Sequence, residues 1–215
     1  MTKVMLVLAA LALVVTPRTP VQDPPMTFFL TSVGPGNGAD LGGLAGADRQ
    51  CHTLAEAAGS TGVEWHAYLS TVASASGPAI NARDRIGGGP WYNAKGVRVA
   101  SGVADLHSDD NHLTKQTVLT ERGVVVNGRG DRPNMHDVLT GSNLDGTAFT
   151  GEGYTNCDNW TSGGAGAARV GHHDRAGGGD AGTSWNSAHN SRGCSQENLV
   201  GTGGNGLFYC FGTAR

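Results

Sequence analysis

Histidine and aspartate side chains gather in one stretch of the C-terminal third of the chain. Gly171-His172-His173-Asp174-Arg175 is followed closely by Ser184-Trp185-Asn186-Ser187-Ala188-His189. Imidazoles and a carboxylate are ligands that zinc prefers, and zinc with one open position could activate water for hydrolysis. The candidate metal ligands are therefore His172, His173, Asp174 and His189. The sequence contains no H-E-x-x-H spacing, so solvated or hydrogen-bonded loop residues are the alternative interpretation.

A second polar cluster, Asp131-Arg132-Pro133-Asn134-Met135-His136-Asp137, lies upstream. Its oxygens could bind calcium together with Asp105, Asp109 and Asp110. The alternative is a turn in which Asp and Asn side chains bond to their own backbone. Taken with the aromatic and amide side chains downstream, the candidate ligand-binding residues are Arg129, Asp131, Asn134, His136, Asp137, Trp185 and Asn186.

Two short motifs overlap these regions. Arg129-Gly130-Asp131 spells the integrin-binding tripeptide, which we interpret as a chance occurrence in a glycine-rich chain. Asn159-Trp160-Thr161 is a glycosylation sequon, which has meaning only in a eukaryotic secretory pathway.

Several common activities are not favoured by the sequence. It contains no G-x-S-x-G nucleophile elbow, no phosphate-binding P-loop and no dinucleotide fingerprint. The 15 basic and 18 acidic residues give a net charge of −3 without a long run of one sign, which argues against a nucleic-acid-binding surface. We therefore expect a binding module rather than an enzyme.

The first 25 residues differ from the rest. Lys3 precedes an apolar run from Val4 to Val15, and several prolines follow. This pattern is typical of a secretory signal peptide and is too short to span a bilayer. We expect residues 1–25 to be a signal peptide with a short proline-rich leader, residues 26–215 to be one domain without a transmembrane segment, and the protein to be secreted or periplasmic.

The chain has four cysteines: Cys51, Cys157, Cys194 and Cys210. Behind a signal peptide, four cysteines predict two disulfides, for which three pairings are possible. Close pairs such as C-x-x-C, which a cysteine zinc site would need, do not occur.

The elements that must position these side chains are short. Apolar spacing predicts a helix over residues 45–58 with Cys51 facing inward, and alternation predicts a half-buried strand over 63–70. Further strands are expected at residues 27–32, 91–92, 97–99, 124–126 and 207–211, with a single turn of helix near 81–85. The 35 glycines predict many turns and long irregular loops between them.

Several blocks resemble the endostatin domain of collagens, a member of the C-type-lectin-like superfamily. They are GADRQC (46–51), WHAYLS (65–70), DVLTGSNLDG (137–146), CDNWT (157–161), Cys194 and FYC (208–210). The likeness covers about residues 27–212. It implies an α+β, C-type-lectin-like fold with a mixed, largely antiparallel sheet, and nested pairing of Cys51 with Cys210 and of Cys157 with Cys194.

The resemblance implies less about function than about the fold. The calcium-chelating Glu-Pro-Asn, Gln-Pro-Asp and Trp-Asn-Asp triplets of sugar-binding relatives are absent. Endostatin-type domains bind heparan sulfate through arginine patches, which the negative net charge does not favour here. We expect an extracytoplasmic module that binds a glycan or a surface protein through loops 129–146 and 163–193. The alternatives are a zinc enzyme that uses His172, His173 and His189, and a structural part of an extracellular assembly.

Overall fold

The computed structural model describes residues 24–150, 155–179 and 181–214. Residues 1–23 of the expected signal peptide lie outside this part. The described residues form an α+β structure. Its helices are α1 (Gly43–Ala57), η1 (Ala82–Asp84), α2 (Val103–Leu106), α3 (Cys157–Trp160) and α4 (Gln196–Thr202). Its strands are β1 (Phe28–Leu30), β2 (Val63–Ala67), β3 (Trp91–Tyr92), β4 (Arg98–Ala100), β5 (Asp137–Leu139), β6 (Arg169–His172), β7 (His189–Asn190) and β8 (Gly204–Ala214).

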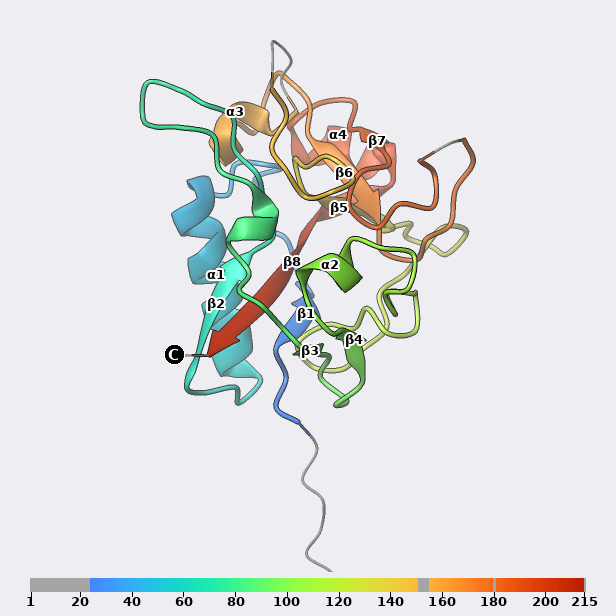
Figure 1. Cartoon of the computed structure of the whole chain (residues 1–215). Helices are drawn as coiled ribbons and strands as arrows, with labels where there is room; N and C mark the ends of the chain where they lie inside the picture. The colour runs from blue at the N-terminus through green and yellow to red at the C-terminus, as the bar shows by residue number, and fades with distance from the viewer. Residues whose placement is uncertain (1–23, 151–154, 180, 215) are drawn as a thin grey trace, which may run out of the picture.

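The long strand β8 organises the main sheet. The strand order is β1-β8-β5-β6-β7, and β2 pairs with β8 further along its length. The pairing is antiparallel except between β5 and β8, which run parallel. Figure 1 shows β8 crossing the molecule, with α1 and β2 on one side and α2, β3 and β4 on the other. The first described strand therefore pairs with the last.

Side chains alternate along β8 and divide the core in two. Phe208 and Cys210 pack with α1 and both disulfides in one cluster, while Tyr209 and Phe211 pack in an aromatic cluster on the opposite face. Because both faces of β8 are covered, these side chains are buried whichever face they project from. Tyr68, which follows β2 and packs in the aromatic cluster, is likewise fully buried.

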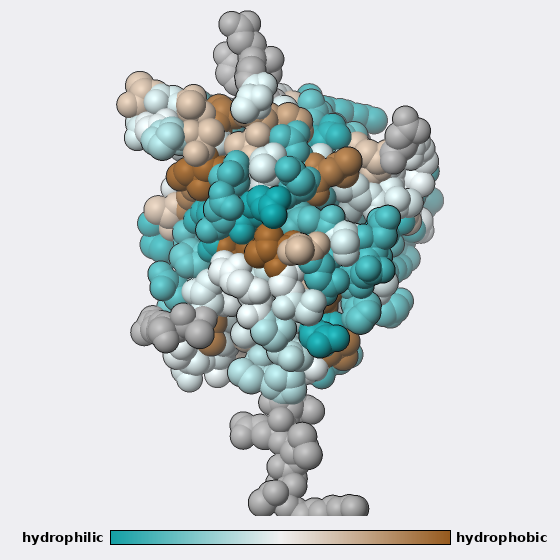
Figure 2. Space-filling view, in the orientation of Figure 1, coloured by the Kyte–Doolittle hydropathy of each residue, from teal (hydrophilic) through white to brown (hydrophobic). Residues whose placement is uncertain are grey.

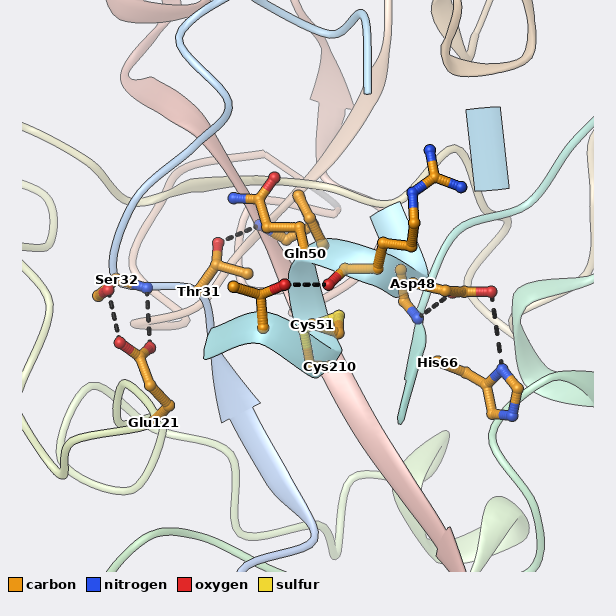
Figure 3. The surroundings of a disulfide bond; sticks show 12 residues. Thr31, Ser32, Asp48, Gln50, Cys51, His66, Glu121 and Cys210 are labelled. Atoms are coloured by element: carbon orange, nitrogen blue, oxygen red, sulfur yellow. Dashed lines mark hydrogen bonds and ion pairs between the residues drawn. A yellow bond between two sulfur atoms is a disulfide. The ribbon is translucent and has the colours of Figure 1, made fainter. Parts of the chain in front are cut away.

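Two nested disulfides connect these elements, as the resemblance implies. Cys51 on α1 bonds Cys210 on β8, and Cys157 on α3 bonds Cys194. Figure 3 shows the first bridge between α1 and β8. Residues 157–160 all have left-handed φ angles, between 49° and 68°. The adjacent disulfide and the Trp160 Nε1–H bond to the Ser70 carbonyl (2.9 Å) hold this turn.

The remaining elements agree in part with expectation. The helix begins at Gly43 instead of residue 45 and ends within a residue of its expected end, and the 91–92 and 97–99 segments form the β3–β4 hairpin. The strand expected at 124–126 is wrong, because Val125 makes only an isolated bridge to Leu119 and Val124 is exposed. In the described residues no helix is long and apolar enough to cross a bilayer. The face drawn in Figure 2 mixes polar and weakly apolar side chains, with only small strongly apolar patches.

Candidate metal centre

Four titratable side chains meet where β5, β6 and β7 lie side by side. The Asp137 Oδ1 atom is 3.1 Å from His136 Nε2, 3.3 Å from His172 Nε2 and 3.5 Å from His189 Nε2. The Nε2 atoms of His172 and His189 are 2.9 Å apart. Among the described residues, His136, Asp137 and His172 are the group identified as able to hold a metal ion.

The strand register accounts for this meeting. Asp137 and His172 are directly paired across β5 and β6, so their side chains project from the same face of the sheet. His189 on β7 pairs with Val170, two residues before His172, which places the His189 ring diagonally beside the His172 ring. His136 lies just before β5 and stacks on His172, with ring centroids 4.1 Å apart.

Asp137 is a buried carboxylate without a matched donor. Its side chain is 2% exposed, and neither oxygen reaches hydrogen-bond geometry with a donor among the described residues. Burial alone would raise the Asp137 pKa, but the imidazoles of His172, His189 and His136 outweigh burial and bring the pKa to about 2. The group is therefore ionised at neutral pH, and a buried anion requires a compensating positive charge.

The outer nitrogens of the three imidazoles face oxygen acceptors. His172 Nδ1 is 2.6 Å from the Gly182 carbonyl, and His189 Nδ1 is 3.1 Å from the Asn190 carbonyl. His136 Nδ1 is 3.5 Å from Asp174 Oδ1. A carbonyl can only accept, so a cation bound at Nε2 would place the proton of His172 and His189 on Nδ1, where each carbonyl can receive it.

This arrangement has the features of a zinc site. The ligand atoms of His136, Asp137 and His172 lie within 4.8 Å of one another, with His189 beside two of them. Each outer nitrogen meets an oxygen, as in most histidine-ligated metals. Ligands at 2.0–2.1 Å from a tetrahedral zinc are about 3.3 Å apart, and the distances above range from 2.9 to 3.5 Å. Calcium, which takes six to eight oxygens, does not fit a set dominated by nitrogen.

Of the four metal ligands expected from the sequence, the structure brings two into the cluster. His172 and His189 belong to the cluster. His173 does not, because the next residue along an extended chain points to the other side; its Nε2 lies 3.1 Å from the Asn127 carbonyl. Asp174 contacts His136 and accepts the Arg129 backbone N–H, so it orients a ligand. His136 and Asp137, candidate ligand-binding residues of the upstream polar cluster, complete the group.

The other candidate ligand-binding residues do not form one surface with the cluster. Trp185 (3% exposed) and Asn186 (1%) are buried, and the Asn186 amide donates to Tyr68 Oη and to two carbonyls. Asp131 pairs with Lys115 and accepts the Gly128 N–H. Arg129 is exposed, and the Asn134 side chain accepts the His136 N–H.

The short motifs are occupied by structural contacts. Asp131 of the integrin-type tripeptide already pairs with Lys115. Both ends of the Asn159 amide bond to the Val72 backbone, so a glycan could not be attached without breaking these bonds. Asp105, expected as a calcium ligand, accepts from the Ser101 N–H and hydroxyl instead.

No protein-family model matches the chain, and no curated protein matches it. The resemblance to endostatin-type domains thus stays a prediction. The function is inferred below from the geometry of the cluster.

Proposed function

We propose that this protein is a zinc-binding module in which His136, Asp137, His172 and His189 hold one zinc ion. The observation that carries the proposal is the buried, ionised Asp137 carboxylate with three imidazole Nε2 atoms around one of its oxygens. A divalent cation would supply the positive charge that this carboxylate requires, and it would use the three nitrogen lone pairs as ligands.

The number of protein ligands favours a structural zinc over a catalytic one. Catalytic zinc sites keep one position for water or substrate, whereas structural sites are filled by four protein ligands. Three side chains, His136, Asp137 and His172, already have ligand atoms within 4.8 Å of one another. His189 Nε2 lies 2.9 Å from His172 Nε2 and 3.5 Å from Asp137 Oδ1, and we propose that it closes in as the fourth ligand when the ion binds. His189 is 42% exposed while the other three are buried, which gives the ion a route from solvent.

For the wider role, we keep the expectation from the sequence of an extracytoplasmic module that binds a glycan or a surface protein. Two disulfides are typical of proteins from oxidising compartments, which supports an extracytoplasmic location. We propose that the zinc-held scaffold displays its loops to a glycan or a surface protein, since binding residues concentrate on loops that a rigid scaffold positions.

Metal analysis of the purified protein tests the zinc proposal. The oxidised chain, expressed without a histidine tag and dialysed against zinc, should retain about one zinc ion per chain. His136→Ala and His172→Ala should each lose it. His112→Ala, at a histidine outside the cluster, and His173→Asn, beside a ligand but turned away from the cluster, should retain it.

Two outcomes would overturn the proposal: a wild-type chain without zinc, or zinc retained equally by the His136 and His172 variants. The first would mean that protonated His189 alone balances Asp137. Circular dichroism of each variant checks that loss of zinc does not reflect an unfolded chain.

A further inference from the structure

A pocket of about 260 Å³ lies beside the metal centre. One wall comes from the chain that joins two of the metal ligands, His172 and His189. The other wall comes from residues near 107–109 and from Leu144. The lining residues contributed by the connecting chain are Arg175, Ala181, Thr183, Ser184, Trp185 and Asn186.

His172 holds this wall directly. Its backbone N–H donates to the Ser184 carbonyl (2.8 Å), and its ring Nδ1 lies 2.6 Å from the Gly182 carbonyl. Gly171 meets the same segment so closely that an added Cβ would lie 1.9 Å from the Trp185 carbonyl oxygen. The ring bond is the part of this contact that depends on which nitrogen of His172 carries the proton.

Arg175 is held by the same group of residues. Its φ angle is 52°, a left-handed conformation that costs a non-glycine residue on the order of 1 kcal/mol. Its N–H donates to the His172 carbonyl (3.0 Å), and its guanidinium donates to Asn111 Oδ1 (3.0 Å). The preceding residue, Asp174, contacts the ring of His136.

Without a cation, the proton of His172 has two competing acceptors. On Nδ1 it serves the Gly182 carbonyl, and on Nε2 it would serve the buried Asp137 carboxylate. A metal on Nε2 removes the second choice, fixes the Nδ1–H tautomer and strengthens its donation to Gly182. Metal removal would therefore favour the other tautomer and leave the Gly182 carbonyl without its donor.

We propose that metal occupancy controls the shape of this pocket: zinc holds the wall formed by Arg175 and residues 181–186, and its loss releases that wall. This inference rests on the proposed zinc site. It means that a ligand of the pocket would bind with an affinity that depends on zinc, because linkage between two sites is reciprocal.

Limited trypsin digestion of the full oxidised chain tests the proposal. Arg175 is the only lysine or arginine, and hence the only trypsin site, between His172 and His189. Cleavage after Arg175 should be at least about tenfold slower in the zinc-loaded protein than in chelated protein, which corresponds to about 1.4 kcal/mol of local protection. Arg122, which is exposed and belongs to neither the metal centre nor the pocket, serves as the internal control site.

The outcomes separate the two claims. If zinc binds in about one equivalent but the Arg175 cleavage rate does not change, the inference is wrong and the zinc site stands. If cleavage at Arg122 rises in parallel with Arg175, chelation unfolds the whole domain and the local effect is refuted. If no zinc binds to the wild-type chain, the proposed function fails first.

Discussion

At the scale of single residues, the chemistry centres on Asp137 and on the acceptors that orient its histidine neighbours. Asp174 shows how a residue that touches no metal can matter. Its Oδ1 faces His136 Nδ1, and its other oxygen accepts the Arg129 N–H. Burial opposes a low Asp174 pKa, yet His136 and the backbone donors of Arg129 and Ala176 hold that pKa well below its usual range. Asp174 is therefore a charged acceptor at neutral pH.

We predict that Asp174→Asn lowers zinc affinity by 10- to 100-fold, the usual effect of removing a partner of a ligating histidine. The weaker amide acceptor would leave the His136 ring less firmly oriented. Competition with a chromophoric chelator measures the change. Asp84→Asn, at an exposed aspartate outside both the metal centre and the pocket, is the matched control and should leave affinity unaltered. Equal affinity in the Asp174 variant would remove Asp174 from this role.

At the scale of elements, α1 is fixed to its neighbours by Asp48. The Asp48 carboxylate accepts the Ala67 N–H of β2 (2.8 Å) and pairs with Arg85 (2.6 Å), and Figure 3 shows its approach to His66. Burial acts to raise the Asp48 pKa, but the contacts with His66, Arg85 and the Ala67 N–H outweigh it, and the pKa lies below its ordinary value. Ionised Asp48 thus stabilises the fold.

Asp48→Asn should lower the free energy of unfolding by about 2 kcal/mol at pH 7, the scale of hydrogen bonds to a charged group. A depressed pKa contributes stability above the unfolded-state pKa, near 3.9, and loses it as the pH falls further. The difference between wild type and variant in urea denaturation should therefore shrink below about pH 4. Glu56→Gln, exposed on the same helix, is the control. A difference that persists undiminished at pH 2–3 would contradict this account.

The elements also show what the sequence could predict. Residue spacing locates α1 closely and predicts strands at β2 and β8, because each carries an apolar pattern. The strand bounds differ: β2 ends at Ala67 instead of residue 70, and β8 extends over Gly204–Ala214 instead of 207–211. The strand expected at 124–126 fails because those valines find no neighbouring strand to pair with, and only Val125 bridges Leu119.

Only two of the four residues of the metal centre, His172 and His189, were predicted as metal ligands from the sequence. The spacing of His172 and His189 on one glycine-rich stretch suggested a site. His136 and Asp137 join them through the register of β5 against β6, which pairs residues 35 positions apart and leaves no mark in the local sequence. The sequence marked His136 and Asp137 only as members of a separate polar cluster, 131–137, and not as partners of His172 and His189.

At the scale of the whole molecule, the two disulfides constrain loops of different length. Cys51 and Cys210 are separated by 159 residues, and Cys157 and Cys194 by 37. In the chain-entropy model, these bridges remove about 5 and about 4 kcal/mol of unfolded-state entropy, respectively. The outer bridge also joins α1 to the central strand.

We predict that replacing Cys51 and Cys210 together by alanine destabilises the domain by about 1 kcal/mol more than replacing Cys157 and Cys194 together. Urea denaturation of the two double variants at equal zinc saturation measures this difference. The opposite order would show that the inner bridge, which closes the left-handed turn at Cys157–Trp160, stabilises the native state by more than chain entropy.

Anomalous diffraction at the zinc absorption edge, from crystals of the tag-free, oxidised chain grown with one equivalent of zinc, tests the zinc site directly. We expect one strong peak about 2.0–2.2 Å from the Asp137 carboxylate and from the Nε2 atoms of His136, His172 and His189. A cluster without an anomalous peak, with Asp137 paired to protonated His189, would contradict it.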